Sequence, residues 1–101
     1  MYYILEGKNV VPTDLYTWGE WFNKSNRHVD FTELDGLEVS TVFLGLDHNY
    51  FGGAPAIFET MIFDADGNDK YCTRCTTWLQ AEEMHKKAIE WIKKGCIDDS
   101  D

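Results

Sequence analysis

The 25 residues from Val39 to Phe63 most constrain the fold, because two strongly apolar segments there enclose a short polar insertion. The first segment reads VSTVFLGL, the second reads AIFETMIF, and the insertion between them reads DHNYFGGAP. Short runs rich in Val, Ile, Phe and Thr predict strands. We therefore expect two core strands joined by a polar connection that is displayed at the surface.

Turn signals predict that the strands are arranged in hairpins. The predicted turns are Gly7-Lys8, Asp35-Gly36 and the loop Ala65–Asn68. The strands that flank them are expected at 2–5 and 10–11, at 28–34 and 38–46, and at 56–63 and 70–76. Strand 38–46 carries apolar residues at both odd and even positions, which point to opposite faces, and this predicts a central strand covered on both faces. In the last hairpin Glu59 stands opposite Arg74, which predicts an ion pair across the sheet.

Two helices complete the predicted fold. The first is expected over 14–23, with Thr13 as its N-cap and with Leu15, Trp18 and Phe22 on one face. The second is expected over 78–94, because Thr77 and Gln80 form a capping box and Gly95 is a natural stop. Its predicted buried stripe consists of Ala81, Met84, His85, Ala88, Trp91 and Ile92.

These elements predict an α+β fold in one domain over residues 1–101, with a frayed acidic tail at 97–101. We expect a single antiparallel sheet of five or six strands, with the second helix packed on one face and the first helix beside it.

The charge balance limits the kinds of partner. Eighteen acidic residues against nine basic ones give a net charge of −9, which disfavours direct binding to nucleic acid or to an anionic membrane. The same charge suits a basic surface on a protein, and it also serves solubility. No apolar run approaches the roughly 20 residues that span a bilayer. Three cysteines cannot all pair with one another, so we expect a reducing, cytoplasmic location.

Two local motifs resemble metal sites but have simpler interpretations. Cys72 and Cys75 have the spacing of half a zinc site, yet residues three apart on a strand point to opposite faces. The segment 64–69 resembles a calcium loop, but its glycine is the fourth residue rather than the sixth. We interpret the first as two half-buried thiols and the second as a hairpin turn, and we expect no cofactor.

Two candidate sites involve the connection between the core strands. Asp47 and His48 open it, and with Glu59 and His85 they would form a metal- or ligand-binding enzyme site if the four converge. The ordinary alternative is a turn histidine and a core histidine. Tyr50 and Phe51 lie beside two glycines, so they would serve either as exposed binding anchors or as a lid over the end of the sheet.

The order of motifs resembles a family of small uncharacterised proteins of tailed bacteriophages and prophages. The similar motifs are YYILEGK, W-x-x-W-F, VSTVFLGLDH, FETM and TW-x-x-A-x-x-x-H, and they extend from Tyr2 to His85. The polar positions that the resemblance implies are Asp47, His48, Glu59, Thr60, Arg74 and His85. It implies a phage or prophage origin and says little about activity.

The sequence therefore predicts a small acidic phage-type protein that binds another protein and inhibits a host enzyme or defence complex. That last step is an analogy with other phage proteins. The binding residues expected are Asp47, His48, Tyr50, Phe51, Glu59, Arg74 and His85. The alternatives are the four-residue enzyme site and, compatible with either function, a homodimer formed through an exposed sheet edge.

Overall fold

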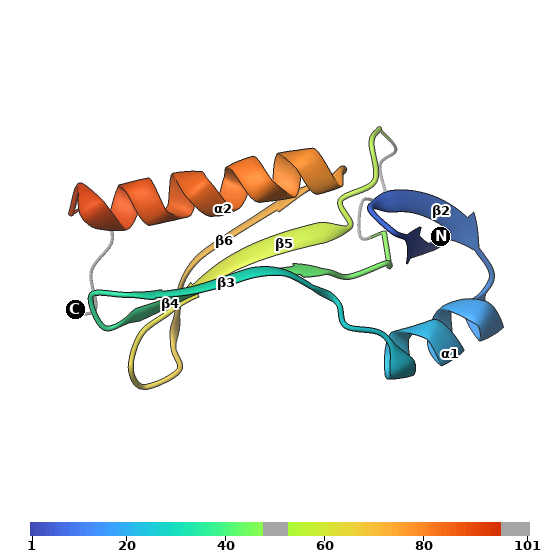
Figure 1. Ribbon diagram of the computed structural model, residues 1–101, viewed down its shortest axis with the longest axis horizontal. Coiled ribbons are helices and arrows are strands. Elements are labelled where there is room, and N and C mark those ends of the chain that lie inside the picture. Colours follow the sequence, from blue (N-terminus) through green and yellow to red (C-terminus); the bar gives the residue numbers. More distant parts are fainter. Residues whose placement is uncertain (48–52, 96–101) are drawn as a thin grey trace.

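A four-stranded antiparallel sheet forms the centre of the computed structural model, which describes residues 1–47 and 53–95 (Figure 1). In spatial order its strands are β3 (His28–Leu34), β4 (Leu37–Phe43), β5 (Phe58–Phe63) and β6 (Asp69–Cys75). Helix α2 (Trp78–Lys93) lies along one face of this sheet. The α+β class, the final helix packed on the sheet and both predicted hairpins of the sheet are confirmed.

The N-terminal elements form a separate unit at one end of the molecule. Strands β1 (Tyr2–Glu6) and β2 (Asn9–Thr13) pair only with each other as a two-stranded sheet, and α1 (Leu15–Lys24) packs against β1. The turn at Gly7 has φ +64°, as a glycine-led hairpin turn requires. The expectation of a single sheet is therefore wrong, and α1 does not lie beside α2 (Figure 1).

Gly45 explains why the two sheets stay separate. Its φ of +71° turns the chain immediately after β4, so the strand ends at Phe43 rather than Leu46. The Tyr3 N–H donates to the Gly45 carbonyl at 2.7 Å, and Tyr2 forms an isolated bridge with Leu46. The hairpin thus contacts the segment that leaves β4 instead of extending the sheet.

The core lies between α2 and the sheet. On β4 and β5 every second side chain is buried, and α2 buries the residues that face them. The buried residues of these elements are Leu37, Val39, Thr41, Phe43, Phe58, Thr60, Ile62, Ala81, His85, Ala88 and Ile92. Strand β4 is central as predicted, but only its α2 side is buried, because Glu38 on its other side is exposed. The prediction that both faces are covered is wrong.

The two helices begin as local sequence dictates, with one difference. In α2 the capping box of Thr77 and Gln80 is present. In α1 the N-cap is Asp14 rather than Thr13, and its carboxylate accepts the Thr17 N–H at 2.8 Å. Hydrogen bonding to the Thr17 backbone is the main cause that holds the pKa of the Asp14 carboxyl below its usual value, and burial acts in the opposite direction.

The buried faces of both helices are narrower than predicted. Leu15 is 53% exposed, because α1 contacts its neighbours through Trp18, Trp21 and Phe22 further along the helix. In α2, Trp91 is 41% exposed and packs edge-on against Tyr71. None of the described helices is long and apolar enough to cross a membrane.

Candidate functional site

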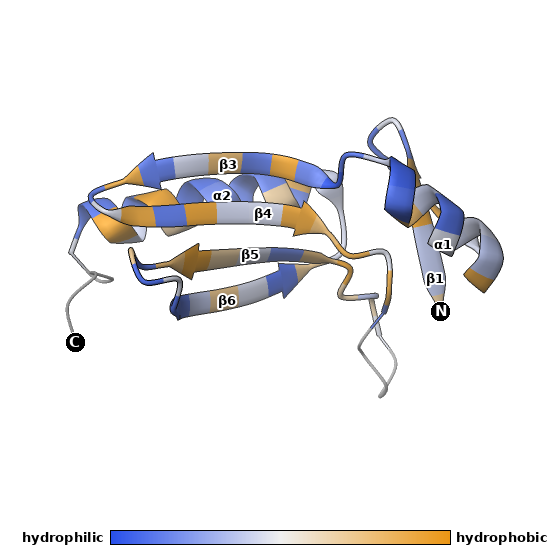
Figure 2. Cartoon of the chain, turned by 90° about the horizontal axis from the view of Figure 1, so that it is seen from below, coloured by the Kyte–Doolittle hydropathy of each residue, from blue (hydrophilic) through white to orange (hydrophobic). Residues whose placement is uncertain are grey.

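The side of the four-stranded sheet that faces away from α2 is the open face, and Figure 2 looks onto it. Because side chains alternate along a strand, the open face receives the residues between the buried ones. Its residues are Phe31, Glu33, Glu38, Ser40, Val42, Glu59, Met61, Phe63, Cys72 and Arg74. In the part of the chain that the structure describes, no helix or strand covers this face.

An ion pair between β5 and β6 lies on the open face. Glu59 is in register with Arg74, as predicted. The guanidinium of Arg74 contacts Glu59 Oε2 through Nη2 at 2.9 Å and donates to it through Nε at 3.0 Å. The Cys72 thiol donates to the same carboxylate oxygen at 3.6 Å. The Glu59 carboxylate is therefore fixed by its own sheet, and its charge is paired with that of Arg74.

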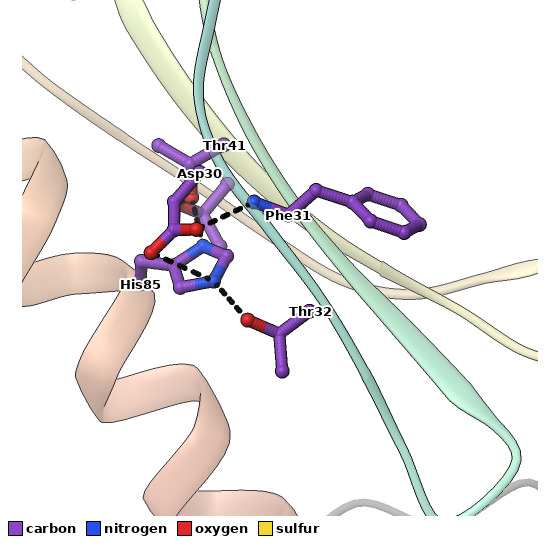
Figure 3. A network of polar contacts seen from close by, with 6 residues as sticks. Asp30, Phe31, Thr32, Thr41 and His85 are labelled. Carbon is purple, nitrogen blue, oxygen red and sulfur yellow. Dashed lines mark hydrogen bonds and ion pairs between the residues drawn. The ribbon is translucent and has the colours of Figure 1, made fainter.

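On the other face, His85 of α2 contacts β3 and β4 directly and is linked to β5 through Thr41. Its Nδ1 lies 2.7 Å from Thr41 Oγ1, and its Nε2 lies 2.9 Å from Thr32 Oγ1. Thr41 Oγ1 in turn lies 2.6 Å from Thr60 Oγ1. The Asp30 carboxylate approaches Nε2 at 3.6 Å (Figure 3). A neutral imidazole has one donor and one acceptor nitrogen, so the ring bridges Thr41 and Thr32.

The nearby carboxylate favours a proton on Nε2 of His85. The Nε2–H then donates to Thr32, and Nδ1 accepts from the Thr41 hydroxyl. Burial lowers the pKa of His85, while Asp30 opposes this effect. Thr41, Thr60 and His85 are all at most 1% exposed, so no substrate reaches them. We conclude that this network fixes the position of α2 on the sheet and is not a catalytic centre.

The predicted enzyme site is not assembled as a whole. Glu59 lies on the open face and His85 on the face beneath α2, so the sheet separates them. Asp47 accepts the Ala56 N–H at 3.3 Å, which ties together the two ends of the connection. His48, like Tyr50 and Phe51, lies outside the described residues, so the display of this connection stays a prediction.

The two motifs that resemble metal sites have simple structures, but Cys72 is exposed rather than half-buried as predicted. Cys72 is on the open face and Cys75 on the other face of β6. Burial raises the pKa of both thiols, that of Cys75 to about 11, so neither is an activated thiolate. Within residues 1–47 and 53–95, no group of three or more His, Cys, Asp or Glu side chains is placed to hold a metal ion.

The calcium-like loop is a hairpin turn organised by Asp64. Its Oδ1 accepts the N–H groups of Asp66 and Asn68, both at 2.9 Å. Hydrogen bonding to the Asn68 backbone is the main cause that lowers the pKa of this carboxyl. Lys70 lies 3.7 Å from Oδ2. The Asp64 carboxylate thus stabilises the turn through hydrogen bonds to its backbone.

Sequence reasoning did not single out Phe31 or the polar partners of His85. Phe31 is 48% exposed at the edge of the open face, and its ring points away from His85 and α2 in Figure 3. The signal in the sequence for this network was the pair Thr41 and Thr60. They are polar residues on the faces of β4 and β5 that are otherwise apolar.

No family model matches the chain, and comparison with curated proteins and with solved structures found no similar one.

Proposed function

We propose that this protein acts by binding another protein, and that the open face of its four-stranded sheet is the contact surface. The partner contributes a surface that is apolar at its centre and basic at its rim. The observation that supports this proposal most directly is that the open face combines half-exposed apolar side chains with carboxylates and has no covering layer among the described residues.

The apolar part of the open face runs across its middle. Val42 and Met61 lie on the two central strands, with Phe31 beside them on β3. Strands with one face in solvent usually place polar residues on that face, so a Phe and a Met at such positions favour contact with another molecule. Aromatic and Met side chains are also enriched in the centres of protein interfaces.

Carboxylates surround the apolar residues. Glu33 and Glu38 stand directly opposite each other at the hairpin end, while Glu59 lies toward the other end of β5. Two like charges in direct register destabilise a sheet. Their pairing is therefore better explained by recognition of a basic surface than by stability, and the net charge of −9 would speed the encounter.

The resemblance to phage proteins suggests a biological setting for this proposal. It favours a cytoplasmic host enzyme or defence complex as the partner, which binding would inhibit. In this proposal Tyr50 and Phe51, in the connection between β4 and β5, add contacts to the partner.

Affinity purification from host cells, with mass spectrometry of the co-purifying proteins, tests the proposal. The baits are the wild type, Glu33→Lys, the pair Phe31→Ser and Met61→Ser, and the control Glu6→Lys. Glu6 ends β1 and is exposed, and its partner Asn9 is neutral, so its reversal changes the net charge equally without touching the open face.

The expected result is a partner recovered with the wild type and with Glu6→Lys but lost with both open-face variants. Melting temperatures of all baits establish that each is folded. Equal recovery with every bait, or recovery of no specific partner by the wild type, would refute the proposal. Tyr50→Ala combined with Phe51→Ala then shows whether the connection contributes, since loss of capture without a lower melting temperature requires those rings.

A further inference from the structure

A second surface, distinct from the open face, lies between the edge strand β6 and α2. A groove of about 550 Å³ separates them, lined by Tyr71, Thr73, Arg74, Cys75, Thr76, Gln80, Glu83, Met84, Lys87 and Trp91. The α2 side of β4 and β5 is buried, whereas Tyr71, Thr73 and Cys75 on β6 are only half-buried. Helix α2 therefore leaves the last strand of the sheet incompletely covered.

The backbone of β6 is available on its outer side. Among the described strands β6 pairs only with β5. The Cys75 carbonyl points toward β5, because it accepts the Ile57 N–H at 3.0 Å. Backbone groups alternate between the two sides of a strand, so those of Cys72 and Arg74 point outward. An edge with outward N–H and C=O groups is a template for a further strand.

The opposite edge of the sheet is blunted, which makes β6 the better template. Strand β3 has an irregular register between His28 and Asp30. The Asp30 carboxylate also accepts the Phe31 N–H of its own strand, at 2.8 Å. Bulges and inward-turned charges are devices by which edge strands avoid pairing with other chains.

Charge indicates what the groove binds. Of the nine Lys and Arg residues in the chain, six lie within residues 69–94, which form β6 and α2, together with four Asp and Glu residues. The rest of the chain has three basic residues and fourteen acidic ones. At physiological salt, charges more than about 8 Å apart are largely screened, so a ligand in the groove responds mainly to this segment. Among the residues that line the groove, Arg74 and Lys87 are basic and Glu83 is acidic.

We propose that the β6 edge binds an extended acidic peptide segment of another protein as a fifth strand, with alternate apolar side chains of the peptide entering the groove. Tyr71, Met84 and Trp91 provide the apolar surface of the groove, and Lys87 lies at its rim. Strand addition of this kind gains affinity from main-chain hydrogen bonds and specificity from pockets for every second side chain. A second copy fits less well, because a two-fold axis would bring the basic segment against itself.

A display library of random decapeptides, selected against the wild-type protein, tests this proposal. We expect the enriched peptides to carry β-branched residues at every second position and to have a net negative charge. An enriched peptide, synthesised with a fluorescent label, is then titrated by polarisation against two matched pairs of variants. Cys72→Pro removes an outward N–H, whereas Cys72→Val keeps it. Lys87→Glu changes the groove, whereas Lys86→Glu changes the neighbouring exposed position by the same charge.

The expected loss of affinity is about tenfold for Cys72→Pro and about threefold or more for Lys87→Glu, with no change for the two controls. The Lys pair decides the question if Cys72→Pro does not fold. Enrichment of basic peptides, no enrichment, or equal affinity of all variants would overturn the proposal. So would concentration-dependent dimerisation that Cys72→Pro abolishes, since the edge would then serve a second copy. Cys72 lies on the open face, whereas Lys86 and Lys87 lie on α2, so the result of the Lys pair is independent of the proposed function.

Discussion

The two faces of the four-stranded sheet are built from the same strands but are stabilised differently. Beneath α2, Val39, Ile62 and Ala88 form a core cluster without exposed surface. On the open face the neighbouring positions of the same strands are half-exposed, and Glu59 and Arg74 pair at the surface. The comparison teaches that one face provides the free energy of folding and leaves the other free to serve recognition.

The polar groups of the two faces also differ in how they are paired. Beneath α2, His85 is hydrogen-bonded to Thr32 and Thr41, and Thr41 to Thr60, so that the helix has one favoured position over the sheet. Those of the open face include two glutamates in direct register, an arrangement that folding alone would not favour. The predictions below test this division of roles, beginning with the largest effect.

The sharpest test compares two consecutive residues of β5 that point to opposite faces. Ile62→Ala should lower the free energy of unfolding by about 2–5 kcal/mol, because it leaves a cavity in the core. Met61→Ala on the open face should lower it by about 1 kcal/mol or less. Chemical denaturation of both variants measures the difference. Similar losses would show that the open face also supports the fold.

The second test uses pH to probe the buried network. Because the pKa of His85 is lowered on folding, unfolded chains bind a proton there below about pH 6.5 while folded chains resist it. Stability is therefore present above this pH and should fall on acidification, by at most about 1.4 kcal/mol per pH unit, until the folded-state pKa is passed. Asp30 is the titratable group that faces His85 in the described part of the chain.

Urea unfolding between pH 7.5 and 5 measures this slope. The carboxyl groups of Asp14 and Asp64 have pKa values below 3.8 in the folded protein, so the stability they contribute is lost only at lower pH. The variant His85→Leu, which has no imidazole, should lose the slope above pH 5. A slope that persists in this variant would contradict the assignment.

The smallest expected effect concerns the like-charge pair. Glu33→Lys should raise the free energy of unfolding by about 0.2–1 kcal/mol, because it places opposite charges across the hairpin. It should weaken partner capture at the same time. Glu6→Lys, opposite the neutral Asn9, should leave stability within about 0.5 kcal/mol of the wild type. A destabilised Glu33→Lys would mean that the two carboxylates do not repel each other.

Local signals in the sequence predicted most of the elements. The capping box at Thr77 set the start of α2, and the Asp35-Gly36 turn set the β3–β4 hairpin. The register of Glu59 with Arg74 followed from loop length, and it is confirmed. These features depend on interactions between residues close in sequence or joined by one turn, which is why they could be deduced.

Features that depend on distant residues were missed. The separate N-terminal sheet follows from the backbone at Gly45, which the apolar run 38–46 concealed. The partners of His85 come from two strands that are distant from it in sequence, so no spacing pattern reveals them. The open face was mistaken for a covered one, because Val42 and Met61 are as apolar as the core residues beside them. That excess of apolar residues is an observation on which the proposed interface rests.

The tight approach at Gly45 has a consequence for variation of this chain. A methyl group there would lie 2.5 Å from both the Trp18 indole nitrogen and the Tyr3 carbonyl. The N-terminal hairpin and helix also pack on the end of the sheet, where the Trp21 ring meets Phe43 edge-on. Position 45 has no room for a side chain, so the orientation of the N-terminal unit relative to the four-stranded sheet depends on a glycine there.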